Sequence, residues 1–123
     1  NCCLPATQER IYIDAFAPSI RDFLKVLHHC TSIIGNEGGA INMGKALGIP
    51  TFTIFSPWIN KQSWNAGEDG IKHVSVHLRD LKPELYGEDL PKKMKARALE
   101  LYEHLSPDLF EKLFNAFNSK HYG

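Results

Sequence analysis

The apolar positions of the chain change their period several times, and each change marks a predicted element. Alternating apolar and polar residues, rich in β-branched and aromatic types, predict short β-strands. These predicted strands cover residues 11–13, 31–35, 51–55 and 72–78. Apolar residues three or four apart predict a helix after each of the first two strands. Strands that alternate with helices predict an α/β fold, a Rossmann-like parallel sheet flanked by helices with right-handed crossovers.

Local signals set the predicted helix boundaries. Ser19 is a good N-cap for the first helix, and Asp22 stands three residues later, as in a capping box. Gly48 can end the second helix in a left-handed conformation. We expect residues 1–10 to be an irregular lead-in, and residues 88–123 to form C-terminal helices. All 123 residues are thus expected to form one partial Rossmann-like domain.

Two C-terminal helices follow from further signals. Pro91 suits the first turn of a helix that runs to about His104, and Ser106-Pro107 suits the start of the last helix. The last helix carries one wide apolar side, made of Leu109, Phe110, Leu113, Phe114 and Phe117. Because this side is wide for a terminal helix, we expect it to pack either on the sheet or on a partner domain.

Composition excludes several classes of protein. The 14 basic and 14 acidic residues cancel, so no basic face for nucleic acid is indicated. No apolar run reaches the ~20 residues that a membrane span needs. Three cysteines argue against a disulfide framework, and we expect Cys30 to be buried and inert. His73 and His77 share one face of a predicted edge strand, where we expect them to be solvated and to bind no metal.

A glycine-rich turn interrupts both periodicities between the second strand and the second helix. It reads Asn36-Glu37-Gly38-Gly39, and paired glycines allow a sharp turn and the close approach of a ligand. A helix that begins at the carboxyl end of a strand presents free N–H groups, which suit a phosphate. The residues expected to bind this ligand are Asn36, Glu37, Gly38, Gly39, Ala40, Asn42 and Lys45.

A loop without periodicity follows the third strand, from residue 56 to residue 70. It holds both tryptophans of the chain, and loops of this length often carry function. Its candidate ligand-binding residues are Ser56, Trp58, Asn60 and Lys61. The alternative is that the tryptophans anchor the loop to the body of the protein or to another domain.

The stretch from residue 35 to residue 57 resembles the signature of lipopolysaccharide heptosyltransferases, glycosyltransferase family 9. The matching residues are Gly35, Asn36, Gly39, Ala46, Leu47, Gly48, Pro50, Thr51, Phe55 and Pro57. The departures are Glu37, Gly38, Asn42 and Ser56, where the family has Asp, Thr, His and Gly. Three of these departures fall on the turn that faces the ligand.

The resemblance implies an inverting, metal-independent GT-B glycosyltransferase with two Rossmann-like domains. The chain matches the later part of the C-terminal domain, which in this family binds a nucleotide-sugar donor such as ADP-heptose. The lipopolysaccharide-core acceptor and the catalytic Asp would belong to an N-terminal domain. We therefore expect a fragment with no catalytic residue, cofactor or metal, which does not turn over substrate by itself. The parent bacterial protein would be cytoplasmic, with peripheral association at the inner membrane.

Two other functions remain open at this stage. A sugar-nucleotide epimerase carries a similar Asp-Ser-Gly-Gly turn, although the residues after the turn fit the transferase better. A noncatalytic α/β interaction module would use the apolar last helix as its contact surface. Binding of ADP-sugars or UDP-sugars would separate these functions.

Overall fold

The computed structural model describes residues 3–88 and 91–122 and contains a parallel sheet of three strands in the order β1-β2-β3. The strands are β1 (Ile33–Asn36), β2 (Thr51–Ile54) and β3 (His73–Val76). Three of the four predicted strands are therefore confirmed, and β3 lies at an edge, as predicted. The register pairs Asn36 with Ile54 and Ile54 with Val76, so all three strands end at one edge of the sheet.

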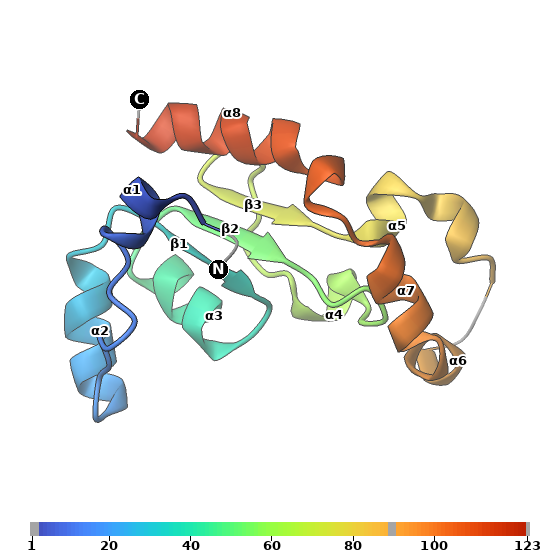
Figure 1. Ribbon diagram of the computed structural model, residues 1–123. Coiled ribbons are helices and arrows are strands. Elements are labelled where there is room, and N and C mark those ends of the chain that lie inside the picture. The colour runs from blue at the N-terminus through green and yellow to red at the C-terminus, as the bar shows by residue number, and fades with distance from the viewer. Residues whose placement is uncertain (1–2, 89–90, 123) are drawn as a thin grey trace.

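Helices make up most of the remaining chain (Figure 1). Their bounds are α1 Pro5–Gln8, α2 Ile20–His28, α3 Gly39–Ala46, α4 Lys61–Trp64, α5 Leu78–Leu81, α6 Pro91–Ala96, α7 Ala98–His104 and α8 Glu111–Tyr122, with 3-10 turns at η1 Pro83–Leu85 and η2 Pro107–Leu109. The protein is thus an α/β structure with helices around a parallel sheet, as the alternating pattern predicted.

The two faces of the sheet are covered by α3 and α8. On one face, a Cβ built on Gly44 of α3 would lie only 2.7 Å from Ile33 Cγ2, so the absence of a side chain brings helix and sheet together. On the other face, Phe114 and Phe117 of α8 pack their rings 5.4 and 5.5 Å from the ring of Phe52. The apolar side of the last helix therefore packs on the sheet through Phe114 and Phe117, one of the two placements that the sequence predicted.

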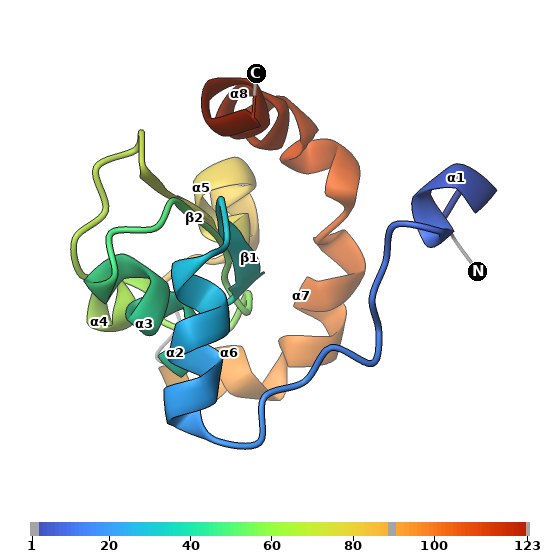
Figure 2. The same cartoon turned by 90° about the vertical axis from the view of Figure 1, so that its left-hand side faces the viewer.

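The prediction of a strand at residues 11–13 is wrong. Ile11 N–H bonds to the Gln8 carbonyl and Ala15 N–H bonds to the Tyr12 carbonyl, so the backbone forms local turns instead of a ladder. Tyr12 and Ile13 are 81% and 86% exposed. Figure 2 shows α1 and the segment after it standing apart from the sheet. The apolar pattern of residues 11–13 is compatible with a strand, but no strand in the described part of the chain pairs with this segment.

The prediction of an irregular lead-in at residues 1–10 was only partly correct. Residues 5–8 form α1, with Pro5 in its first turn, while residues 1–2 lie outside the described part of the chain. Ser19 caps α2 as predicted, because its hydroxyl accepts a hydrogen bond from Asp22 N–H at 3.1 Å. Gly48 follows α3 with a φ of 71°, also as predicted. Cys30 is exposed, so the expectation of a buried thiol was wrong.

The C-terminal third is more broken than the sequence predicted. The helix expected from Pro91 to His104 is divided into α6 and α7, and Arg97 between them has ψ near 10°, outside helical values. The last helix begins at Glu111 because η2 takes up residues 107–109. The connector after β3 contains α5 and η1, and the loop after β2 contains α4. Residues 89–90 and 123 of this region lie outside the described part of the chain.

A second apolar cluster lies beyond the carboxyl ends of the strands, where α5, α6 and α7 gather in Figure 1. Its fully buried members are Leu78, Tyr86, Met94 and Leu101, one from each of four segments after β3. Trp58, from the loop after β2, packs against this cluster. The cluster therefore ties the loop after β2 to the C-terminal helices.

Candidate functional site

The glycine turn, residues 36–39, joins the end of β1 to the start of α3. Gly38 has φ 146° and ψ −164°, a backbone conformation that is essentially restricted to glycine. The first hydrogen bond along the helix runs from Asn42 N–H to the Gly38 carbonyl at 3.1 Å. Within the described residues, the N–H groups of Gly38, Gly39 and Ala40 make no hydrogen bond. Gly39 and Ala40 are exposed, so these donors face solvent at the carboxyl edge of the sheet.

Glu37 connects the glycine turn to the loop after β2. Its Oε2 accepts a hydrogen bond from Ser56 N–H at 3.0 Å. Two of the segments expected to bind ligand are therefore joined directly, although they lie 19 residues apart in the chain. Asn36 and Asn42 are both exposed near the same turn. The structure thus brings Asn36, Glu37, Gly38, Gly39, Ala40, Asn42 and Ser56 together.

Lys45 does not belong to this group. It lies in the last turn of α3, and its ammonium donates to Asn65 Oδ1 at 3.1 Å and to the Ala66 carbonyl at 2.8 Å. A rise of about 1.5 Å per residue places it roughly 9 Å along the helix from the free amides. In this structure Lys45 therefore holds the loop against α3, away from the amides at the start of the helix.

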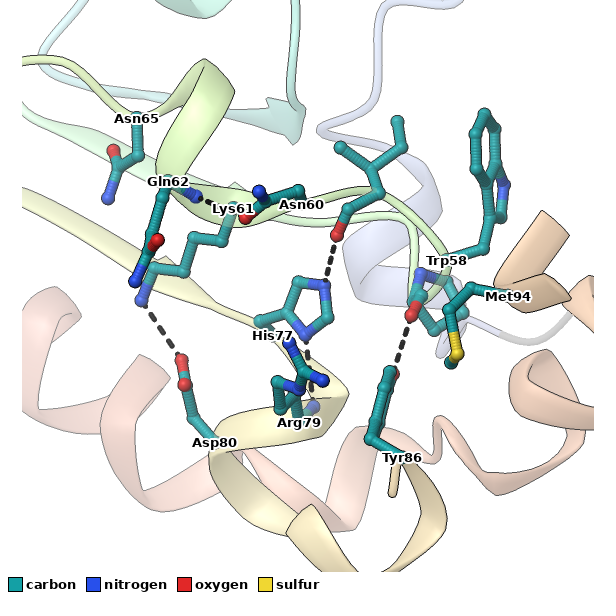
Figure 3. Close-up of a pocket in the computed structure, with 12 residues that line it drawn as sticks. Trp58, Asn60, Lys61, Gln62, Asn65, His77, Arg79, Asp80, Tyr86 and Met94 are labelled. Carbon is teal, nitrogen blue, oxygen red and sulfur yellow. Dashed lines mark hydrogen bonds and ion pairs between the residues drawn. The ribbon is translucent and has the colours of Figure 1, made fainter. Parts of the chain in front are cut away.

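A pocket of about 640 Å³ lies under the loop after β2. We call it the loop pocket (Figure 3). Its lining comes from the segment between Pro57 and Asn65, from the segment between His77 and Tyr86, and from Met94. Trp58, Asn60 and Lys61, which the sequence singled out, all line it, whereas no residue of 36–45 does. The sequence-predicted residues are therefore divided between the glycine turn and the loop pocket.

His77 forms the back of the loop pocket and is only 3% exposed, so the expectation of a solvated histidine was wrong. Its Nδ1 accepts a hydrogen bond from Arg79 N–H at 3.0 Å, which assigns the proton to Nε2. Nε2–H then donates to the Ile59 carbonyl at 2.8 Å. Burial lowers the pKa of His77, so the ring stays neutral. Because both ring nitrogens are bonded, His77 holds the pocket in shape and is not free to act as a base.

Tyr86 closes the floor of the loop pocket. Its hydroxyl donates to the Pro57 carbonyl at 2.6 Å, and the guanidinium carbon of Arg79 lies 5.1 Å from the centre of its ring. Burial raises the pKa of Tyr86 to about 12, so the hydroxyl remains a donor. Sequence reasoning missed Arg79 and Tyr86, because they follow β3 in a stretch without periodicity. Only tertiary packing brings them under Trp58.

Lys61 reaches across the loop pocket to two carboxylates. Its ammonium lies 3.0 Å from Asp80 Oδ2 and 3.7 Å from Glu68 Oε2. Glu68 in turn accepts hydrogen bonds from Ser75 N–H and the Ser75 hydroxyl, at 3.1 and 2.8 Å, and a further one from the Asn65 amide. These contacts hold the loop against β3.

His73 of β3 is half-buried, and its Nδ1 lies 3.1 Å from Thr51 Oγ1.

A comparison of the chain with protein-family models, curated proteins and solved structures finds no match in any of the three. The likeness to family 9 thus depends on the residues of the glycine turn and the elements around it. No described helix has the length and apolar character that crossing a bilayer requires. The described residues also contain no group of three or more His, Cys, Asp and Glu side chains placed to hold a metal ion.

Proposed function

We propose that this chain is the donor-binding part of a Rossmann-like domain in an inverting, metal-independent glycosyltransferase of the family 9 type. Its ligand would be a nucleotide-sugar such as ADP-heptose. The acceptor, the lipopolysaccharide core, would bind to an N-terminal domain that also carries the catalytic Asp. The observation that carries this proposal is the set of unpaired N–H groups at Gly38, Gly39 and Ala40, at the carboxyl edge of a parallel sheet.

The chemistry of sugar transfer explains why such amides matter. Negative charge grows on the departing diphosphate, and preorganised N–H donors can stabilise it without a metal. The start of α3 adds roughly half a positive charge from the helix dipole. Glu37 is held by Ser56 N–H, which keeps one carboxylate oxygen on the protein and away from a phosphate at the amides. In this proposal Glu37 shapes the turn and Asn42 is left to contact the donor.

The test is titration of the 123-residue chain with ADP-glucose and UDP-glucose by calorimetry. Gly38→Ala should weaken binding of the ADP-sugar at least about tenfold, because alanine cannot keep the turn and several charge-assisted hydrogen bonds are lost. Gly70→Ala is the matched control: Gly70 has φ 69°, its Cβ position is open, and it precedes β3 at the opposite edge. Gly70→Ala also places alanine at a positive φ, and this variant should still bind the ADP-sugar.

Four results would change the assignment. Binding that Gly38→Ala leaves intact would remove the amides from the site. A folded chain that binds neither nucleotide-sugar would contradict donor binding by this chain. A clear preference for the UDP-sugar would favour the epimerase-like alternative. Measured sugar transfer by the chain alone would contradict the assignment of the catalytic base to another domain.

A further inference from the structure

The loop pocket offers many more hydrogen-bond donors than acceptors. Within the described residues, the Arg79 guanidinium makes no hydrogen bond or ion pair, and its carbon lies 5.1 Å from the centre of the Tyr86 ring. The Gln62 side chain and the Trp58 indole N–H also make no hydrogen bond there, and the Asn60 amide nitrogen is not used in its cap to Gln62 N–H. Among the side chains of the described lining residues, the acceptor oxygens without a hydrogen bond are those of Gln62 and the Oδ1 of Asp80. A ligand that satisfies these groups must be rich in acceptors.

The formal charge of the lining is positive. Lys61 and Arg79 contribute two cations, Asp80 contributes one anion, and His77 is neutral with both nitrogens bonded. Lys95 stands just outside, with its ammonium 5.6 Å from the Trp58 ring. Because Lys61 is already shared between Asp80 and Glu68, Arg79 is the lining cation without a paired carboxylate among the described residues. A negatively charged group on the ligand would find its partner there.

The walls of the loop pocket are fixed before any ligand enters. The Pro57 carbonyl is held by Tyr86 and the Ile59 carbonyl by His77, so the backbone that carries Trp58 is tied at both sides. Met94 is buried against the same floor. Trp58 is only half-buried, and Figure 3 shows it at one side of the pocket, with Lys61 and Asp80 at the other. A pocket of about 640 Å³ is within the usual range for small-molecule sites.

We infer that the loop pocket is a second binding site, separate from the glycine turn, for a sugar-sized ligand that carries an oxyanion, either a phosphate or a carboxylate. The oxyanion pairs with Arg79. Hydroxyl groups of the ligand bond to the amides of Asn60 and Gln62, and its apolar ring face packs on Trp58. The aromatic ring, planar amides and free guanidinium each match one part of such a ligand.

The experiment uses Trp58 as its own reporter. Trp64→Phe in the 123-residue chain leaves Trp58 as the sole tryptophan. Its emission, and the NMR signal of its indole N–H, are followed during titration with glucose 6-phosphate, glucuronate and neutral glucose at constant ionic strength. We expect saturable binding of at least one anionic sugar and at least tenfold weaker binding of glucose. Response to the phosphate alone or to the carboxylate alone identifies which oxyanion the pocket takes.

Two substitutions in this background distinguish a site from general charge attraction. Arg79→Gln removes the exposed guanidinium but keeps the backbone N–H that bonds His77, and should weaken the anionic sugar about tenfold. Lys112→Gln removes the same charge from an exposed position on α8 and should change nothing. Equal binding of glucose and the anions, an unchanged affinity in Arg79→Gln, or no saturable response would overturn the inference. Gly38→Ala should leave this binding intact, so the two proposals can fail independently.

Discussion

The glycine turn and the loop pocket lie at the same edge of the sheet, but different parts of the chain build them. Four consecutive residues make the glycine turn, and its ligand groups are backbone amides. The loop pocket takes its walls from segments that begin 20 residues apart, at Pro57 and His77, with Met94 added from α6. A site made of backbone depends on local conformation, whereas a site made of side chains depends on the packing that holds distant segments together.

The two regions also rest on different parts of the apolar core. The glycine turn follows β1 and leads into α3, whose contact with the sheet is set by Gly44. The loop pocket stands on the cluster of Leu78, Tyr86, Met94 and Leu101. A substitution in the apolar contacts under one region should therefore disturb that region before it disturbs the other. The stability and ligand binding of such variants can be measured.

The largest effect is expected from Leu78→Ala. Leu78 is 0% exposed and sits at the centre of the cluster under the loop pocket. Removing its side chain should cost about 2–5 kcal/mol of unfolding free energy, because both burial and packing are lost. We expect urea unfolding to show this loss. At a temperature where the variant is folded, Trp58 emission and anionic-sugar binding should change while ADP-sugar binding persists; loss of both in parallel would contradict the separation.

A smaller effect, on the opposite region, is expected from Gly44→Ala. The added Cβ would lie 2.7 Å from Ile33 Cγ2 and 3.3 Å from Thr51 Cγ2, so α3 must shift away from the sheet. Overpacking, partly offset by the better helix preference of alanine, should give a net loss of about 1–2 kcal/mol. The control for stability alone is Gly39→Ala, whose Cβ would lie 3.9 Å from Met43 Cε, an ordinary contact. Nucleotide-sugar binding should fall in Gly44→Ala; unchanged stability would show that the helix position is not fixed by this contact.

The smallest effect concerns pH. Burial lowers the pKa of His77 in the folded chain. Below pH 6.5, the ordinary histidine pKa, the unfolded chain therefore binds a proton at His77 that the folded chain does not bind. The stability that His77 contributes is present above pH 6.5 and is lost as the pH falls toward its lower folded value. His77→Asn keeps a side-chain acceptor for Arg79 N–H and removes this proton uptake. It should therefore flatten the dependence of stability on pH between about pH 7 and about pH 5.

The control for the pH experiment is His29→Gln, at an exposed position after α2. Its pH dependence should match that of the parent chain. Burial also lowers the pKa of His73, so part of the slope will remain in His77→Asn. A slope identical to the parent chain in His77→Asn would mean that His77 is not the group that links stability to pH.

Local signals predicted much of the glycine turn and its surroundings. The cap at Ser19, the left-handed Gly48, β1, β2 and the helix between them were all predictable, because each depends on residues near in sequence. The strand at residues 11–13 was not, because a strand also needs a neighbour to satisfy its backbone groups. The contacts of Lys45 were not predictable for a related reason: its partners Asn65 and Ala66 lie 20 and 21 residues away.

The loop pocket was only half predictable. Trp58, Asn60 and Lys61 stood out because long loops without periodicity often carry function and this one holds both tryptophans of the chain. His77 looked like a solvated residue on an edge strand, and nothing near Arg79 or Tyr86 suggested that they would lie beneath Trp58. Their places depend on hydrogen bonds to Ile59 and Pro57, 18 and 29 residues away, which no periodicity reveals.

By itself, the sequence determined the alternation of strands and helices, the parallel sheet and the glycine turn, since hydrophobic period and glycine conformation act over a few residues. Tertiary structure alone decided that α8 covers the sheet, that the segment at residues 11–13 stays unpaired, and that a donor-rich pocket forms under the loop. The physical reason is that side-chain packing and hydrogen bonds between distant segments are properties of the folded chain, and no single stretch of it carries them.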